Sequence, residues 1–320
     1  MAPSATRFLA LAASVWAGCG GPADPATSEA VPLRLGGPHP ERVARALLGG
    51  YVGPGGGDPF AAGLLSRDGA DGLVLHSGAL PAEVRALLRD ADGDGALDGD
   101  ELAAAVEPTY YRARALPTTL DVLRRAAPYD EGEPGWFTVE VEGPMTAALR
   151  RVHVPTDALR LAMVGLRETG GLRYPAGTVV VGEHVVGGEA VETTVRTARA
   201  DGAWDYAVYD ADGRLAPATT TAPRPLRAPT DCVGCHLGDR SFEPERSWPA
   251  RPPDSVRGRA LHVPDAWRSR PATVLFDEHA ARDGGVLGIY ATLYAGRLLA
   301  AREAGTLEPA DRALLDALGL

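Results

Sequence analysis

Two cysteines and a histidine stand together in the sequence Cys232-Val233-Gly234-Cys235-His236. This C-x-x-C-H spacing is typical of covalent attachment of a c-type haem. The two thiols add across the two vinyl groups of the haem, and the histidine that follows binds the iron through an imidazole nitrogen. The sequence therefore predicts one haem c, attached through Cys232 and Cys235, with His236 as an iron ligand.

Two other chemistries use cysteines at this spacing. A redox disulfide of the thioredoxin kind opens a helix in a βαβ unit, whereas this motif follows a proline- and threonine-rich loop at 214–231. A structural zinc site needs four ligands, and the chain has no second cysteine pair. Both alternatives stay open beside the haem interpretation.

An acidic run at 90–101 matches the twelve-residue loop of an EF-hand. Carboxylates at loop positions 1, 3, 5, 9 and 12 and the backbone carbonyl at position 7 are the ligands that such a loop offers to calcium. These ligands are Asp90, Asp92, Asp94, Asp98 through a water, Glu101 and the carbonyl of Ala96. The sequence therefore predicts a Ca2+ site, and a solvated acidic loop is the alternative.

The segments beside this loop, 82–88 and 102–106, are predicted to be its entering and leaving helices. A degenerate partner loop is predicted at 67–78, with Val74 placed to pair with Leu97. Its loop positions 1, 3 and 12 are Arg67, Gly69 and Gly78. Such a loop binds calcium poorly, so the filled site is expected to support the structure rather than to act as a switch.

The N-terminus is predicted to be an export signal. One positive charge at 1–7 precedes an apolar run at 8–17 that is too short to span a bilayer. Small residues then lead to Cys19, as in the lipobox of bacterial lipoproteins, although Trp16 replaces the usual leucine. We expect a periplasmic or outer-membrane-anchored lipoprotein that meets the membrane only through a lipid on Cys19. An ordinary cleaved signal is the alternative.

The composition is that of an acidic globular protein. Hydrophobic residues make up 45% and charged residues 23% of the 320, and the net charge is -10. Binding to nucleic acid phosphates needs clustered basic side chains, and no such cluster is visible, so nucleic acid is not an expected partner. No residue of the chain is a lysine.

The expected fold class is α+β, with a helical EF-hand module, an antiparallel β-rich haem domain and a helical C-terminal tail. Alternating polarity predicts strands at 136–141, 178–186, 191–198 and 204–209, with helices at 41–49, 155–168, 287–298 and 310–318. The expected organisation is a signal peptide and lipobox at 1–19, a tether and loop at 20–59, the mainly helical EF-hand module at 60–127, the haem domain at 128–243, and an irregular segment with C-terminal helices at 244–320.

Four segments occur in an order and at a spacing that resemble the cytochrome P460 family. They are the strand at 150–154, the sequence YPAGTVVVGE at 174–183, a W-x-Y strand at 203–209 and the haem motif at 232–236. The resemblance extends over residues 136–242. It implies an antiparallel β-rich haem domain whose distal iron face is often open to small ligands. Some members oxidise hydroxylamine, and the related cytochrome c'-beta proteins bind gases such as nitric oxide.

The sequence departs from that family at Gly182, where hydroxylamine-oxidising members carry a lysine that cross-links to the haem. The departure disfavours hydroxylamine oxidation by that route, and whether the protein is an enzyme is left open. At the matching distal positions stand Arg150, suited to hold an anion, and His153, suited to donate a proton, hydrogen-bond a ligand or bind iron. The alternative places both on a solvent-facing strand edge.

Several other side chains are candidates for a sixth iron ligand. They are His184, His262, His279, Met145 and Met163, of which Met163 has the helical spacing typical of core packing. His39 and His76 are expected at the surface.

The first hypothesis is an exported monohaem c-type cytochrome with a calcium-binding EF-hand, which binds a small ligand or passes single electrons to a redox partner protein. The second is a haem oxidoreductase acting on a small nitrogen or oxygen species without a lysine cross-link. The third is a calcium-binding interaction module with an accessory haem.

Overall fold

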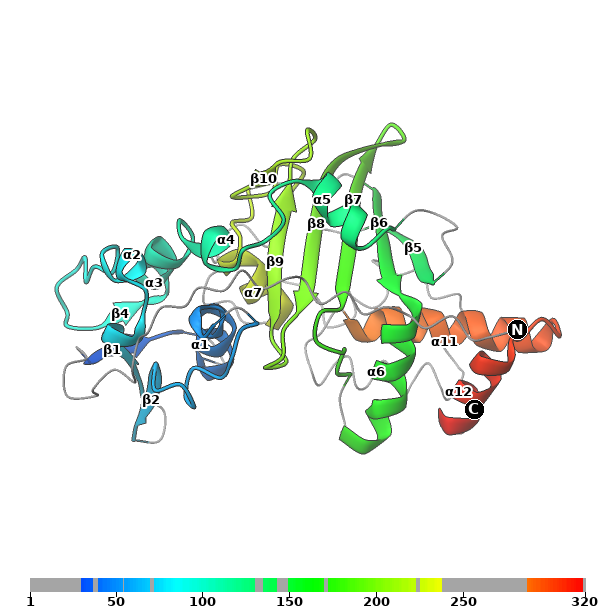
Figure 1. The fold of residues 1–320 in the computed structure, drawn as a ribbon, viewed down its shortest axis with the longest axis horizontal. Helices are drawn as coiled ribbons and strands as arrows, with labels where there is room; N and C mark the ends of the chain where they lie inside the picture. The colour runs from blue at the N-terminus through cyan, green and yellow to red at the C-terminus, as the bar shows by residue number, and fades with distance from the viewer. Residues whose placement is uncertain are drawn as a thin grey trace.

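A six-stranded antiparallel sheet forms the centre of the protein, and a smaller four-stranded sheet lies at one end (Figure 1). The computed structural model describes residues 30–36, 40–53, 55–69, 72–129, 135–142, 149–169, 172–222, 225–237 and 287–318. The protein is thus a mixed α and β structure with mainly antiparallel sheets and several helices, as expected from the sequence.

The large sheet is an up-and-down meander in which each strand lies beside its neighbour in the chain. Its strands are β5 (Trp136–Glu142), β6 (Leu149–Pro155), β7 (Val179–Val186), β8 (Glu189–Ala198), β9 (Trp204–Tyr209) and β10 (Leu215–Ala216). The helix α6 (Thr156–Thr169) separates β6 from β7. The predicted strands and the predicted helix at 155–168 are confirmed.

Alternating side chains give the large sheet two faces with different covers. One, the α5 face, buries Val181, Val195 and Ala207 against α5 (Leu120–Ala126), which crosses in front of the strands in Figure 1. The other, the α11 face, packs against α6, α11 (Leu287–Glu303) and α12 (Pro309–Leu318). Its apolar contacts include Phe137, Val152, Val154, Val180 and Ala198.

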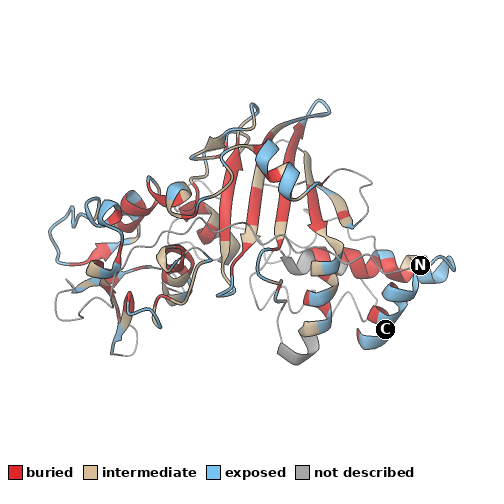
Figure 2. Cartoon of the chain, in the orientation of Figure 1, coloured by how far each residue is buried: buried red, intermediate tan, exposed pale blue. Residues whose placement is uncertain are grey.

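The two C-terminal helices confirm the helical tail, and they lie on the core of the large sheet. Buried residues run along its strands, as Figure 2 shows. Among the described residues, no helix combines the length and the apolar character needed to cross a membrane.

The small sheet has the order β2-β3-β1-β4. Its strands are β1 (Ala30–Arg34), β2 (Leu65–Asp68), β3 (Gly72–His76) and β4 (Leu97–Asp98). β1 pairs with β3 in an antiparallel and with β4 in a parallel manner. Its helices and turns are α1 (Pro40–Leu48), η2 (Gly49–Tyr51), η3 (Ser77–Ala79), α2 (Ala82–Arg85), α3 (Gly99–Val106) and α4 (Tyr110–Ala113).

Two sequence predictions for this region are wrong. The expected tether at 20–59 contains β1 and α1, both of which contribute to the apolar core of the small sheet, although the predicted short helix itself is confirmed as α1. The region 60–127 holds the helices α2 to α5, but it is not helical throughout as expected, because β2 and β3 form a hairpin there.

The predicted degenerate loop at 67–78 is part of that hairpin. Leu73 and Leu75 alternate with less buried neighbours, which is the period of a strand, and both are buried in the core. Leu97 therefore pairs with Leu33 of β1 and not with Val74. The N-terminal strand takes the place that a second loop would have filled.

The small sheet is tied to the large one by buried polar contacts. Arg114 donates from Nη2 and Nε to the carboxylate of Asp205 on β9, at 2.7 to 3.0 Å. Tyr110 Oη accepts from the backbone N–H of Tyr206 at 2.6 Å. The helix α7 (Thr230–Leu237) packs against α1. It therefore lies between the large sheet and the small lobe, by which we mean the small sheet with its helices α1 to α4.

Candidate functional site

The cysteine motif lies on α7, between the small lobe and the edge of β9 in Figure 1. Cys232 is half-buried, and its Sγ lies 4.0 Å from the carbonyl oxygen of Arg227. The side chain of Cys235 lies outside the described residues. Because residues four apart share one side of a helix, Cys232 and His236 lie on the same side of α7.

The imidazole of His236 lies on the large sheet. Its ring stacks on Tyr206 of β9, with centroids 5.3 Å apart and planes at 18°. Arg196 Nη1 of β8 lies 3.3 Å from His236 Nδ1. Arg196 and Tyr206 are cross-strand partners on the α11 face, so His236 contacts that face.

A cluster of polar side chains follows on the same face, away from Arg196. The strand register pairs Gly182 with Thr194, His184 with Glu192, and Arg150 with His184. Since cross-strand partners point to the same side of a sheet, these groups share the α11 face with the contacts of His236.

His184 is the most constrained member of this cluster. It is only 5% exposed, and its Nδ1 lies 2.5 Å from Thr221 Oγ1 and 3.3 Å from Glu192 Oε1. Its other nitrogen, Nε2, is buried and has no hydrogen-bond partner in the described structure. Burial, reinforced by the positive charge of Arg150, lowers the pKa of His184 to about 3, so the imidazole is neutral near pH 7.

Arg150 also has an incomplete set of partners. Its Nη2 lies 3.4 Å from Thr194 Oγ1, whereas its buried Nε has no hydrogen-bond partner in the part of the chain that the structure describes. A Cβ atom at Gly182 would lie 3.0 Å from Arg150 Nη2. The guanidinium of Arg150 therefore lies over position 182, and glycine leaves room for it.

His153 does not join this cluster. Residues 150 and 153 lie an odd number of positions apart on β6, so their side chains point to opposite faces. His153 is buried on the α5 face, where its Nδ1 lies 3.0 Å from Thr138 Oγ1 and its Nε2 lies 3.3 Å from Glu183 Oε2. The expected joint distal site of Arg150 and His153 is thus corrected. The solvent-facing edge expected as the alternative is also wrong for His153.

The remaining candidates separate clearly. Met163 is fully buried in the core beside α11, as its spacing suggested, and His76 Nε2 lies 2.8 Å from Ser66 Oγ. Cys19, His39, Met145, His262 and His279 lie outside the described residues.

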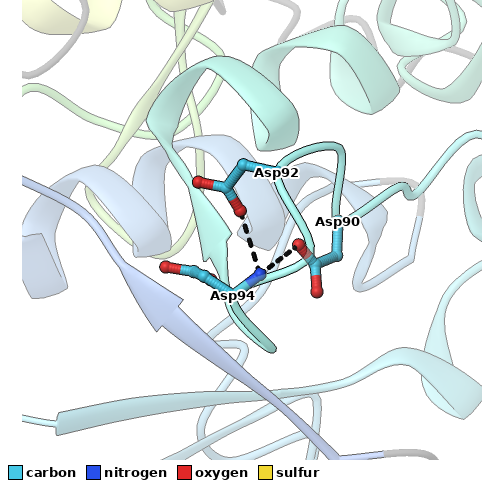
Figure 3. Close-up of side chains that lie close together, drawn as sticks. All are labelled: Asp90, Asp92 and Asp94. Atoms are coloured by element: carbon cyan, nitrogen blue, oxygen red, sulfur yellow. Dashed lines mark hydrogen bonds between the residues drawn. The ribbon is translucent and has the colours of Figure 1, made fainter.

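The acidic loop brings three of its predicted ligands together. Carboxylate oxygens of Asp90, Asp92 and Asp94 all lie within 4.8 Å of one another. Figure 3 shows these side chains around the backbone N–H of Asp94, which donates to Asp90 and Asp92, each at 3.1 Å. Asp90 also accepts from the N–H groups of Gly93 and Gly95. The loop therefore turns around the carboxylate of Asp90.

The other predicted ligands form hydrogen bonds within the loop. Glu101 accepts hydrogen bonds from the N–H groups of Ala91 and Asp98, and Asp98 accepts from Glu101 in return, which caps α3. Ala96 N–H donates to Asp94. Asp94 also forms an ion pair with Arg34 of β1, so β1 supplies the loop with a positive charge.

The loop carboxylates differ in their proton affinity. Backbone hydrogen bonds, the largest from Gly95, lower the pKa of Asp90. For Asp92, the hydrogen bond from Asp94 lowers the pKa, but desolvation and the negative charges of Asp94 and Glu101 outweigh it and raise the pKa overall. A cation would relieve that repulsion.

Comparison of the chain with protein-family models, with curated proteins and with solved structures found no match. The resemblance to the cytochrome P460 family therefore rests on the four sequence segments alone.

Proposed function

We propose that this protein is an exported monohaem c-type cytochrome, with the haem attached through Cys232 and Cys235 and bound at the iron by His236. The observation that carries the proposal is the C-x-x-C-H motif on a helix whose histidine contacts the α11 face. On that face, Arg150 Nε and His184 Nε2 are buried without partners in the described structure. Buried polar atoms normally have partners, so they fit a bound group.

The attachment chemistry needs only residues of α7. Each thiol adds its sulfur to one carbon of a vinyl group and its proton to the other, so no oxidant is consumed. The bound haem supplies a redox-active iron. A guanidinium can only donate hydrogen bonds, so His236 Nδ1 is the acceptor in its contact with Arg196. Binding iron through Nε2 with a proton on Nδ1 therefore requires Arg196 to turn away from His236.

In this proposal the six-stranded sheet is the haem domain, the lobe around loop 90–101 is an EF-hand module, and α11 and α12 are the helical tail. The resemblance to the cytochrome P460 family supports the assignment. Oxidation of hydroxylamine through a lysine cross-link is not proposed, because position 182 is glycine and the chain has no lysine.

Attachment is tested by producing the chain with a c-type haem assembly system and recording its absorption spectrum after denaturation. Covalent haem stays with the denatured wild-type protein and is lost from the Cys232→Ser/Cys235→Ser variant. Cys19→Ser is the matched control and keeps its haem, because Cys19 lies outside the motif. Haem that dissociates from the wild type, or that stays on the double variant, contradicts the proposal.

A second candidate is a haem oxidoreductase for a small nitrogen or oxygen species. The observation that favours it is Arg150, whose buried Nε offers a hydrogen-bond donor on the α11 face. Addition of hydroxylamine, nitrite or peroxide to the oxidised holoprotein then changes its visible spectrum and consumes the compound. A spectrum that none of the three alters contradicts this candidate.

Calcium is proposed as a structural ion of loop 90–101. Three clustered carboxylates, with Glu101 able to turn inward from the backbone, are the oxygen ligands that Ca2+ prefers. Ca2+ is expected to bind in titration calorimetry and to raise the melting temperature. Asp90→Ala abolishes both effects, whereas Asp100→Ala, at a non-ligand position of the loop, keeps them. A large effect of Ca2+ on the reduction potential would instead favour the calcium-interaction hypothesis.

Export and anchoring belong to the same proposal. A lipid on Cys19 tethers the protein to the envelope, where a redox partner protein or a small ligand meets the haem. Membrane fractionation of cells that produce the wild type and Cys19→Ser tests the anchor. Release of the variant, with the wild type in the membrane fraction, is the expected result, and equal distribution of the two contradicts it.

A further inference from the structure

We infer that His184 would supply a second protein ligand to the haem iron in addition to His236, and that Glu192 and Thr221 hold its imidazole in the ligating tautomer. The inference deepens the proposed function and rests on it, since it assigns a residue of this chain to the haem. His236 and His184 both face the α11 side of the large sheet, His236 through its contact with Tyr206 and Arg196, and His184 from β7.

The hydrogen bonds of Thr221 fix the tautomer of His184. Thr221 Oγ1 donates to Glu192 Oε1 at 2.9 Å, and a hydroxyl has only one proton to give. Its contact with His184 Nδ1, at 2.5 Å, is therefore one in which Nδ1–H donates. A neutral imidazole with its proton on Nδ1 has a lone pair on Nε2.

That lone pair has nothing to bind within the described protein. His184 Nε2 is buried and has no hydrogen-bond partner among the described residues. The residue as a whole is only 5% exposed. Burying an acceptor without a partner reduces the free energy of unfolding. A metal ion or a proton donor bound to the acceptor removes that cost.

The partners of Nδ1 are those of a metal ligand. Histidines that bind metals usually donate their other N–H to a carboxylate or a carbonyl, which orients the ring and makes it more basic. Glu192 Oε1 lies 3.3 Å from His184 Nδ1. Glu192 is itself buried and held by Thr220 and Thr221, so the support behind His184 is rigid.

The other described candidates do not compete for this role. His153 uses both ring nitrogens on the opposite face, and Met163 is enclosed in the core between α6 and α11. Two imidazole ligands leave no open position at the iron. Within the proposed function, His184 therefore favours transfer of single electrons over binding of a small ligand.

The visible spectrum of the holoprotein, with and without carbon monoxide, tests this assignment. The wild type is expected to be low-spin in both oxidation states and unchanged by carbon monoxide after reduction. His184→Ala becomes high-spin and binds carbon monoxide, and added imidazole restores the low-spin spectrum. The matched control is His153→Gln, which alters an equally buried histidine on the neighbouring strand and keeps the wild-type spectrum.

A second variant covers the case in which His184→Ala does not fold. Glu192→Gln keeps the ligand but weakens its support, so the spectrum stays low-spin and the reduction potential rises. A wild-type holoprotein that is high-spin or that binds carbon monoxide at once overturns the inference while the proposed haem stands. A wild type without covalent haem overturns the proposed function and this inference with it.

One readout needs no haem. Nitrogen-15 chemical shifts of the haem-free protein are expected to show His184 protonated at Nδ1 and bare at Nε2. A proton on Nε2 overturns the assignment whatever the haem experiments give.

Discussion

The two faces of the large sheet each bury a histidine beside a threonine and a glutamate. On the α5 face, His153 gives one nitrogen to Thr138 and the other to Glu183. On the α11 face, the threonine and the glutamate both meet the same nitrogen of His184. In the first arrangement both ring nitrogens have a partner, and in the second no described residue bonds the remaining nitrogen.

The surroundings of the two histidines differ in the same way. Glu183 also accepts from Arg124 at 3.1 Å, and among the described residues no buried polar atom of the α5 face lacks a partner. On the α11 face, Arg150 Nε and His184 Nε2 have no hydrogen-bond partner among the described residues, and His236 contacts this face. We interpret the α5 face as structural and the α11 face as the one that meets a cofactor.

The largest effect is expected from breaking the buried ion pair on the α5 face. Asp205→Asn leaves the guanidinium of Arg114 buried without its counter-charge, which costs about 3–5 kcal/mol of unfolding free energy. Urea denaturation measures the loss. The haem spectrum of the folded variant is expected to match the wild type, and a shifted spectrum would break the division between the faces.

In the haem-free protein, the two histidines are expected to contribute differently to the unfolding free energy. His153→Ala removes one partner from each of Thr138 and Glu183 and costs about 1–3 kcal/mol beyond the loss of packing. His184→Ala is expected to cost less, because Glu192 keeps its bonds from Thr220 and Thr221. Denaturation of both variants gives the difference, and an equal or reversed cost would count against the comparison.

The two faces also differ in the pH range over which their buried groups affect the stability of the protein. The folded pKa of His184, about 3, lies below its ordinary 6.5, so its contribution to stability is present above pH 6.5 and is lost as the pH falls toward 3. The hydrogen bond from His153 is the main cause that lowers the pKa of Glu183 below 4.5. The stability that Glu183 contributes is therefore lost only below about pH 4.5.

Variants of the haem-free protein distinguish these two windows. His184→Gln is expected to flatten the fall in unfolding free energy between pH 6.5 and 4.5, whereas Glu183→Gln flattens it only at lower pH. Urea denaturation at a series of pH values measures both. Identical pH profiles for the two variants would show that the windows are misassigned.

The smallest effect is expected at the exposed margin of the α5 face. Arg151 and Glu140 pair at 3.1 Å, but the side chain of Glu140 is half exposed. Water and salt screen such a pair, so Glu140→Gln changes the unfolding free energy by less than about 1 kcal/mol. A loss as large as that of His153→Ala would show that the face is more strongly coupled than its burial indicates.

Much of the large sheet was predictable from its sequence. Runs rich in valine, threonine and aromatic residues mark the strands β5, β7, β8 and β9, although β7 and β9 bury consecutive residues because both faces of the sheet are covered. The small lobe was less predictable, since β1 lies in a segment rich in glycine and proline. The hairpin of β2 and β3 has the glycine spacing of a calcium loop, and this spacing predicts a loop where the buried Leu73 and Leu75 follow the two-residue period of a strand.

The motif residues of the candidate site are visible in the sequence. The residues that share the α11 face with the contacts of His236 are not. Parity along β6 was enough to separate Arg150 from His153 once the strand was predicted. The pairing of His184 with Glu192 was not accessible in the same way. A regular hairpin around Gly187 and Gly188 would place Val191 opposite His184, and a register shift beside His184 brings Glu192 there instead.

We propose that α7 carries a covalent haem against the α11 face. The most direct test is the intact mass of the protein matured with a c-type haem assembly system, followed by mapping of its peptides. One haem per chain is expected, on the peptide that contains Cys232 and Cys235. A chain of unmodified mass, or a haem on any other peptide, would contradict it.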